Sequence, residues 1–183
     1  WTWPGREGEV TPVFVYTNYP TAELFINGKS YGKQSKNNSS LKNRYRLMWM
    51  DTKYEPGEVK VVAYDKNGKA VAEKVVRTAG KSHHIELVSN RNELTADGKD
   101  LAYVTVKVVD KDGNLCPADN RQINFSVKGT GKYRAAANGD PTNLEQFHLP
   151  KMHAFNGMLT AILQAGETAG EIVFTAKANG VKA

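Results

Sequence analysis

The sequence predicts an all-β protein made of two tandem immunoglobulin-like β-sandwich domains. Helix signals are scarce, because no apolar stripe with the 3.6-residue helical period extends over even about ten residues. Short runs that alternate between apolar and polar residues recur instead, at a spacing of about 8–12 residues and bounded by Gly, Asn and Asp turns. The length of 183 residues suits one large or two small domains.

The first sandwich is expected over residues 1–80. Its strongest local signal is Asn27-Gly28, which is the pair preferred in a two-residue hairpin turn. Trp49 alternates with Tyr45 and Leu47, so these three side chains are expected on one buried strand face. Strands are predicted around 13–15 and over 22–26, 29–33, 45–49, 59–64 and 70–77.

The second sandwich is expected over residues 81–183, after a polar linker at residues 79–84. Asn179-Gly180 opens a last hairpin whose second strand is barely present, so an incomplete edge strand is expected. Strands are predicted over 85–88, 101–109, 122–127, 133–137, 158–163 and 171–178.

Composition excludes several classes of protein. Charged residues make up 24% of the chain, and 3 Trp, 8 Tyr and 6 Phe supply enough aromatic side chains to argue against disorder. The single cysteine, Cys116, excludes an internal disulfide and a cysteine-based zinc site. No apolar run approaches the roughly 20 residues of a membrane helix, so no membrane partner is expected. The chain starts at Trp1 rather than Met, which indicates a processed product or a piece of something longer.

The polar motifs favour turns over chemistry. Asp110, Asp112 and Asn114 have the spacing that opens a calcium loop, but Leu115 and Arg121 occupy the positions that need Gly and Glu. Tight-turn stabilisation therefore explains them better. His148 and His153 match no metal-ligand spacing, so neither a metal nor another cofactor is expected.

Catalytic patterns are also missing from the sequence. Gly28-Lys29-Ser30 imitates the end of a phosphate-binding loop, but position 23 is Glu and a hairpin replaces the required helix. A serine-hydrolase elbow is absent, and nothing pairs two carboxylates across a cleft as a glycosidase requires. We therefore predict no catalytic residue in this chain.

Short motifs follow one another in a specific order along the chain. In the first half they lie at residues 1–8, 13–18, 22–30, 32–33, 54–57, 59–65 and 68–69, and in the second half at 96–101, 104–110, 117–120, 125–127, 129, 138–141, 145, 147 and 155–157. The motifs of the first half resemble a C-terminal module of glycoside hydrolase family 2, as found in secreted Bacteroidetes β-galactosidases. The motifs of the second half resemble the next, invasin-like immunoglobulin module of the same enzymes.

The resemblance implies that the parent protein hydrolyses terminal β-galactosides by a retaining mechanism with two Glu on an upstream barrel. Such a barrel needs about 250 residues with alternating helices, so it lies outside this chain. The catalytic domain is then the expected partner, and a periplasmic or secreted, cell-surface location is implied.

Two roles are open for such an accessory piece, besides a less favoured one as a cell-surface adhesin module. It would either support the catalytic core structurally or bind carbohydrate through flat aromatic rings. Trp1, Trp3 and Tyr19 are the candidate sugar or interdomain contacts, and Asn138 and Asp140 form a distinctive polar loop that is either a turn or a ligand contact.

The basic residues that account for the net charge of +6 lie in one stretch of the sequence. No Asp or Glu occurs from Leu24 to Met50, and the six basic residues in this stretch equal the entire excess of positive charge. Lysines on an exposed strand discourage its edge from pairing with another strand. The sharper hypothesis is that these basic residues bind an acidic patch on the parent enzyme or an anionic glycan. A nucleic-acid partner is not expected, because no nucleic-acid-binding fold accompanies the charge. The six residues are Lys29, Lys33, Lys36, Lys42, Arg44 and Arg46.

Overall fold

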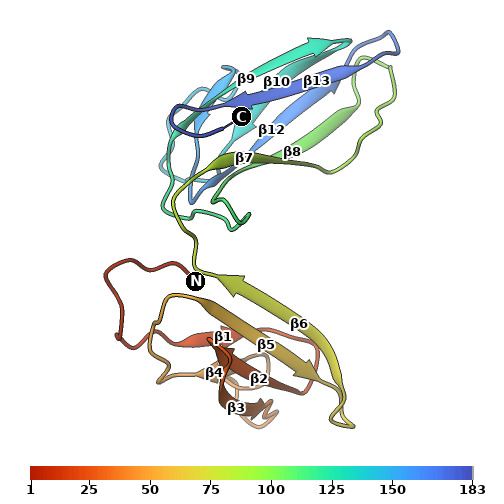
Figure 1. Ribbon diagram of the computed structural model, residues 1–183. Helices are drawn as coiled ribbons and strands as arrows, with labels where there is room; N and C mark the ends of the chain where they lie inside the picture. Colours follow the sequence, from red (N-terminus) through yellow and green to blue (C-terminus); the bar gives the residue numbers. More distant parts are fainter. Residues whose placement is uncertain (183) are drawn as a thin grey trace. The chain divides into compact units, whose positions relative to one another are not determined.

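The computed structural model describes residues 1–182 and confirms the all-β prediction (Figure 1). These residues form thirteen strands in antiparallel sheets, and no helix occurs among them. The described part of the chain accordingly has no helix that could cross a membrane. The chain divides into two compact units, one spanning Trp1–Thr78 and one beginning at Ala79.

The first unit contains a four-stranded sheet in the order β3-β2-β5-β6 and a two-stranded sheet of β1 and β4. Asn27 and Gly28 both have positive φ, of 49° and 80°, as the hairpin turn between β2 and β3 requires. The strands are β1 (Val13–Val15), β2 (Thr21–Ile26), β3 (Lys29–Ser35), β4 (Leu47–Trp49), β5 (Glu58–Tyr64) and β6 (Ala70–Arg77).

The core of this unit follows from alternation along the strands. Every second residue of β2 is buried, and Leu47 and Trp49 of β4 are buried as predicted. The Trp49 indole N–H donates to the carbonyl of Gly32 at 3.1 Å, so the ring also links β4 to β3. The buried core consists of Ala22, Leu24, Ile26, Leu47, Trp49, Val59 and Ala63.

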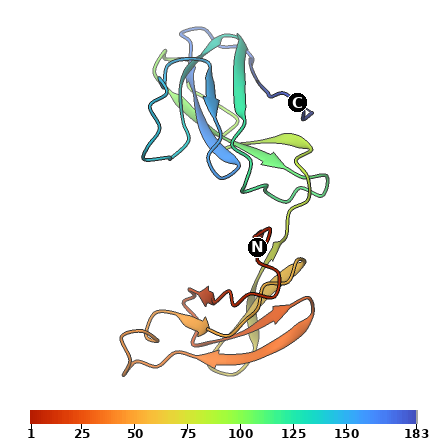
Figure 2. The ribbon, with the colours of Figure 1, turned by 90° about the vertical axis from the view of Figure 1, so that its left-hand side faces the viewer.

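Tyr45 departs from the prediction, because it is 65% exposed rather than buried with Trp49. The loop before β4 makes turns in which the amides of Asn43 and Arg44 both bond the carbonyl of Ser40. The chain becomes extended only at Leu47, so the strand alternation does not reach Tyr45. In Figure 2 this loop between β3 and β4 projects to the left of the sheet.

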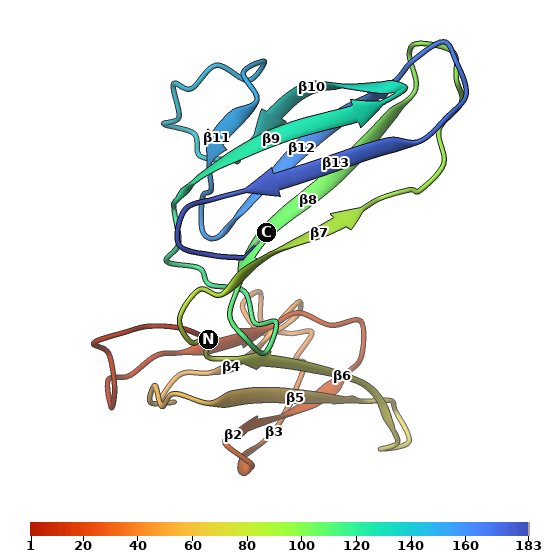
Figure 3. The same ribbon diagram turned by 45° about the horizontal axis from the view of Figure 1, so that its top comes forward.

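The second unit is a sandwich of two sheets, in the orders β10-β12-β8-β7 and β11-β9-β13. Figure 3 shows β9 and β13 as one layer in front of β8 and β12. The strands are β7 (His84–Ser89), β8 (Leu101–Val109), β9 (Gln122–Gly129), β10 (Gly131–Ala137), β11 (Lys151–His153), β12 (Met158–Ala165) and β13 (Ile172–Lys177).

The core of the second unit joins both layers. Val106 and Val108 of β8 pack with Ile123 and Phe125 of β9 in one buried cluster. Met152 belongs to the same cluster and is fully buried, although its three-residue strand β11 carried no clear sequence signal. A smaller buried cluster of Ala102, Val104 and Leu163 lies toward the other end of β8.

The stretch expected to be a linker is hydrogen-bonded to the second unit. The Gly80 amide donates to the Asp110 carboxylate at 2.8 Å, and the Ser82 hydroxyl donates to Asp119 at 2.5 Å. The His83 amide donates to the carbonyl of Val109 at 2.8 Å. The polar residues that suggested a linker therefore satisfy turns of the second sandwich, and His84 already belongs to β7.

Leu24→Ala is expected to lower the free energy of unfolding of the first unit by about 2–5 kcal/mol, because it leaves a cavity in a closed core. Leu24 is fully buried, whereas Leu41 is 80% exposed and provides the matched control. Urea denaturation followed by tryptophan fluorescence measures both variants. Equal effects of Leu24→Ala and Leu41→Ala would contradict the described packing.

Candidate functional site

Trp1 is fixed to its own unit. Its indole N–H donates to the Glu55 carbonyl at 2.8 Å, and its ring meets Tyr54 edge-on with centroids 5.2 Å apart. The Trp1 carbonyl also accepts a bond from the Thr78 hydroxyl at 2.6 Å. These contacts tie the N-terminal segment to the residues that end the unit, which accounts for Trp1 without a sugar.

The other predicted aromatic contacts differ in exposure. Tyr19 packs half-buried against the core of the first unit. The side chain of Trp3 is 50% exposed, so Trp3 offers a freer ring than Trp1 or Tyr19. Flat, exposed aromatic rings can stack on other molecules, and among these three candidates Trp3 has the geometry for it.

The loop containing Asn138 and Asp140 is a self-bonded turn. Asp140 accepts bonds from the amide and hydroxyl of Thr142 at 2.8 and 2.7 Å. The Asn138 side chain donates to the His153 carbonyl at 3.0 Å and accepts the Asp140 amide at 3.0 Å. The polar groups that made this loop distinctive therefore bond within the loop and to β11.

Glu145 pairs with His153 of β11. One carboxylate oxygen lies 3.0 Å from His153 Nδ1, and the other accepts the His153 amide at 3.1 Å. Within residues 1–182, no three His, Cys, Asp or Glu side chains converge in a group that could hold a metal ion.

The six basic residues lie along β3 and the loop that follows it. Lys33 Nζ sits 4.0 Å from the centre of the Tyr64 ring, and the Arg46 guanidinium lies 5.7 Å from that of Phe14. Lys36 donates to the Thr17 carbonyl, and Arg44 donates to the Asn38 carbonyl. Lys29 and Lys33 stand on β3, an edge strand, where lysine discourages pairing with another chain. Binding of these residues to an acidic partner stays a prediction.

An exposed apolar face lies on the two-stranded sheet of the first unit, and sequence analysis missed it. Phe14 pairs with Met48 on the side opposite the core, and Tyr16 and Met50 continue the same alternation. Tyr16 is 69% exposed, and Phe14 and Met50 are also exposed. The available signal was that residues 13–16 and 47–50 are apolar at consecutive positions, which is typical of strands covered on both faces.

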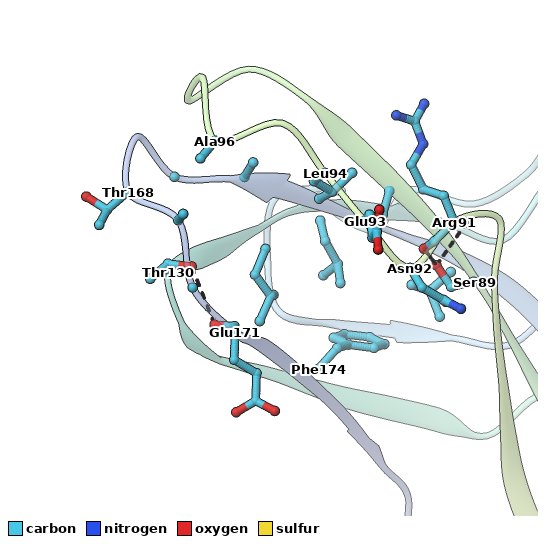
Figure 4. A pocket seen from close by; sticks show the side chains of 18 of the residues that line it. Ser89, Arg91, Asn92, Glu93, Leu94, Ala96, Thr130, Thr168, Glu171 and Phe174 are labelled. Carbon is cyan, nitrogen blue, oxygen red and sulfur yellow. Dashed lines mark hydrogen bonds between the residues drawn. The ribbon is translucent and has the colours of Figure 1, made fainter.

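A cavity of about 740 Å³ opens at one edge of the second sandwich. It lies between β7, β13 and the loops before β8 and β13, and the ring of Phe174 forms part of its floor (Figure 4). Its volume and its mainly apolar lining are both within the range of small-molecule sites. The apolar lining includes Leu87, Leu94, Ala102, Val104, Leu163, Ile172 and Phe174.

The carboxylate with the largest pKa change belongs to a turn. Burial by itself would raise the pKa of Asp110, but hydrogen bonds from Gly80, Asn114 and Asp112 lower it to about 2. The calcium-like spacing of Asp110, Asp112 and Asn114 thus produces a closed turn with donors around one charge.

Asp119 has a lowered pKa for a related reason. Burial opposes the charged form, but the guanidinium of Arg121, at 2.6 Å, and the Ser82 hydroxyl stabilise it. Asp110 and Asp119 therefore both stabilise loops near the start of β7.

The fold defines this chain as a pair of β-sandwich modules. Residues 85–183 match the glycoside hydrolase family 2 C-terminal domain 5, and residues 8–72 match a domain of unknown function, DUF4982. The chain belongs to glycoside hydrolase family 2, as the sequence resemblance predicted.

Curated relatives of this chain are also glycosidases by name. The chain is 41% identical over its full length to beta-galactosidase BoGH2A of Bacteroides ovatus, of which it covers 21%. It is 26% identical over 168 residues to a beta-glucuronidase of Formosa agariphila, covering 90% of this chain and 17% of the relative. The chain thus spans about a fifth of the length of the curated relatives it matches.

Solved structures of glycosidases also resemble this chain in fold. A beta-glycosidase from Bacteroides vulgatus superposes with a TM-score of 0.90 at 30% identity, over 99% of this chain and 22% of that one. A glycosyl hydrolase family 2 member from Bacteroides cellulosilyticus superposes with a TM-score of 0.88 at 34% identity, over 99% of this chain and 23% of that one.

Acid is expected to destabilise the second unit through Asp110. A carboxyl whose pKa is depressed on folding contributes stability that is complete above its unfolded pKa, 3.8, and is lost as pH falls toward about 2. Asp110→Asn should cost about 2 kcal/mol at pH 7, because donors then face a neutral group. Thermal unfolding between pH 7 and pH 2 measures both effects.

Asp112→Asn serves as the control, because Asp112 is exposed and contributes its backbone amide to this turn. If the Asp110→Asn protein kept the acid sensitivity of the unchanged chain, Asp110 would not be its source.

Proposed function

We propose that this chain is a non-catalytic accessory part of a family 2 glycosidase and that it supports the catalytic region structurally. The observation that carries this proposal is its match, over its whole length, to about a fifth of a β-galactosidase. Asp110 and Asp119, two carboxylates whose pKa values are lowered, are bonded to turns of their own unit, which is consistent with a structural role.

The proposed substrate of the parent enzyme is a terminal β-galactoside. We propose that the enzyme acts on it outside the cytoplasm. The 41% identity to a Bacteroides ovatus enzyme named beta-galactosidase supports this choice over the β-glucuronide of the relative at 26% identity. A retaining glycosidase uses two carboxyl groups about 5–5.5 Å apart, and we place this pair upstream of the present chain.

The proposed contact with the catalytic region is the exposed face formed by Phe14, Tyr16, Met48 and Met50. Contiguous exposed apolar side chains on one sheet face are typical of surfaces covered by another protein segment. Arg46 stands over Phe14 at the border of this face and supplies a polar rim, as protein interfaces usually have.

In the full-length enzyme, Tyr16→Asp is expected to lower the unfolding temperature of the catalytic region by several degrees, because it places a charge in a packed interface. Tyr45→Asp is the matched control, since Tyr45 is 65% exposed and is not one of the four residues of this face, whereas Tyr16 is 69% exposed. Calorimetry with kcat/KM on a nitrophenyl β-galactoside measures the outcome. Identical behaviour of the two variants would rule out this contact surface.

The alternative, carbohydrate binding, is tested on the 183-residue chain itself. We expect no specific retention on a glycan array or on insoluble polysaccharide. Trp3→Ala is the informative variant because Trp3 is 50% exposed, whereas loss of Trp1 would also remove packing against Tyr54. Specific retention that Trp3→Ala abolishes would replace structural support with sugar binding.

A further inference from the structure

The first unit has a long strand edge that no other described strand covers. Within residues 1–182, β6 pairs only with β5, so it ends the four-stranded sheet on the side opposite to β3 (Figure 1). β6 is eight residues long and mostly exposed, including the apolar side chains of Val71 and Val76. An uncovered strand edge presents a row of backbone N–H and C=O groups that can accept another strand.

The other edge of this sheet, β3, is better protected against pairing than β6. β3 carries Lys29 and Lys33, and its pairing with β2 shifts register in the middle of the strand. β6 contains one lysine, Lys74, and its pairing with β5 shifts register only before Ala72. Register shifts and edge lysines are common barriers to strand pairing, so the regular stretch from Ala72 to Arg77 is the more open edge.

Alternate residues of β6 direct their backbone groups to this open edge. The Thr78 amide donates to the Gly57 carbonyl at 2.8 Å, so it points toward β5. Successive amides of an extended strand point to opposite sides. The amides of Arg77, Val75 and Glu73 therefore point away from β5, to the open edge.

These three residues are complementary to a second copy of themselves. In an antiparallel pair centred on Val75, Val75 lies opposite its own copy, and Glu73 of each chain lies opposite Arg77 of the other. Residues directly opposite each other share one face of the sheet and are close enough to interact. All three side chains lie on the face away from the core, because the intervening Val76 pairs with the buried Val59.

The charges select this register. Glu73 is exposed and has no ion pair within residues 1–182. Arg77 Nη2 lies 2.7 Å from a carboxylate oxygen of Glu58, and a guanidinium has further N–H donors for a second carboxylate. Only the centre at Val75 brings Glu73 opposite Arg77. A centre at Lys74 or at Glu73 would place like charges opposite each other, which is destabilising.

We propose that β6 joins two copies of this chain through an antiparallel strand pair centred on Val75. The backbone N–H and C=O groups of Glu73, Val75 and Arg77 bond to the partner strand and join the two four-stranded sheets into one. At each end of the pair, Glu73 of one copy binds Arg77 of the other. This surface belongs to a different sheet from the apolar face of β1 and β4, so it does not depend on the proposed contact with the catalytic region.

The ion pairs are tested with Glu73→Arg and Arg77→Glu in the 183-residue chain. Each variant alone places like charges opposite each other at both ends, so the dimer dissociation constant should rise by at least about tenfold. A mixture of the two variants restores opposite charges and should form a heterodimer. Lys66→Glu is the control, since Lys66 is exposed in the turn before β6. Sedimentation velocity over a range of protein concentrations measures all four samples.

The strand itself is tested by amide hydrogen exchange measured by NMR. Raising the protein concentration should slow exchange of the Glu73, Val75 and Arg77 amides by at least about tenfold, because they become bonded. The Lys74 amide, which points to β5, should be protected at every concentration. Val75→Pro removes an N–H from the open edge but none from the β5 ladder, so it should abolish the dimer and leave the dilute chain folded.

Three results would overturn the proposal. The chain would stay monomeric even at about 1 mM, where weak complexes form. A dimer would form that neither charge reversal weakens, which would place the contact elsewhere. Species larger than a dimer would form with protection of β3 amides, which would mean that β6 pairs with β3 of the next copy in an open array.

Discussion

Each sheet of this protein can bury one of its faces, and most features of the two units follow from that constraint. Leu24 and Val106 face inward because their neighbours along the strand face outward. Two small sheets must therefore meet face to face in each unit, and the loops must carry the chain between layers. Hydrogen-bonded turns such as that of Asp110 make those crossings specific.

The faces and edges left over by this packing are the surfaces at which we propose contacts with other segments. The outer face of β1 and β4 is apolar, in contrast to a solvated sheet face, and Phe14 and Tyr16 remain exposed on it. The edge strand β3 carries lysines, whereas the facing edges of β7 and β13 border an apolar cavity. These surfaces differ in chemistry, so they suit different occupants.

The acidic and aromatic residues that first suggest a binding site mostly serve the fold. Asp140 and Asn138 bond a turn, and Trp1 closes the first unit by bonding the backbone and side chain of distant residues. These polar groups are therefore used to form turns and to join segments within each unit.

Local signals in the sequence were sufficient for the class of fold and most strands. The positive φ at Asn27-Gly28 and the alternation in 101–109 are properties of neighbouring residues, so no tertiary information was needed. The same holds for the order of motifs that identifies the family. Strand β11 escaped prediction because three residues carry no periodicity.

The tertiary structure decided the rest. The exposure of Tyr45 depends on where a loop ends, and the role of residues 79–84 depends on bonds to turns about 30 residues away. The apolar face of β1 and the cavity between β7 and β13 arise because sheets are assembled from strands distant in sequence. Periodicity determines which side chains share a face, but which face another layer covers is set by long-range packing.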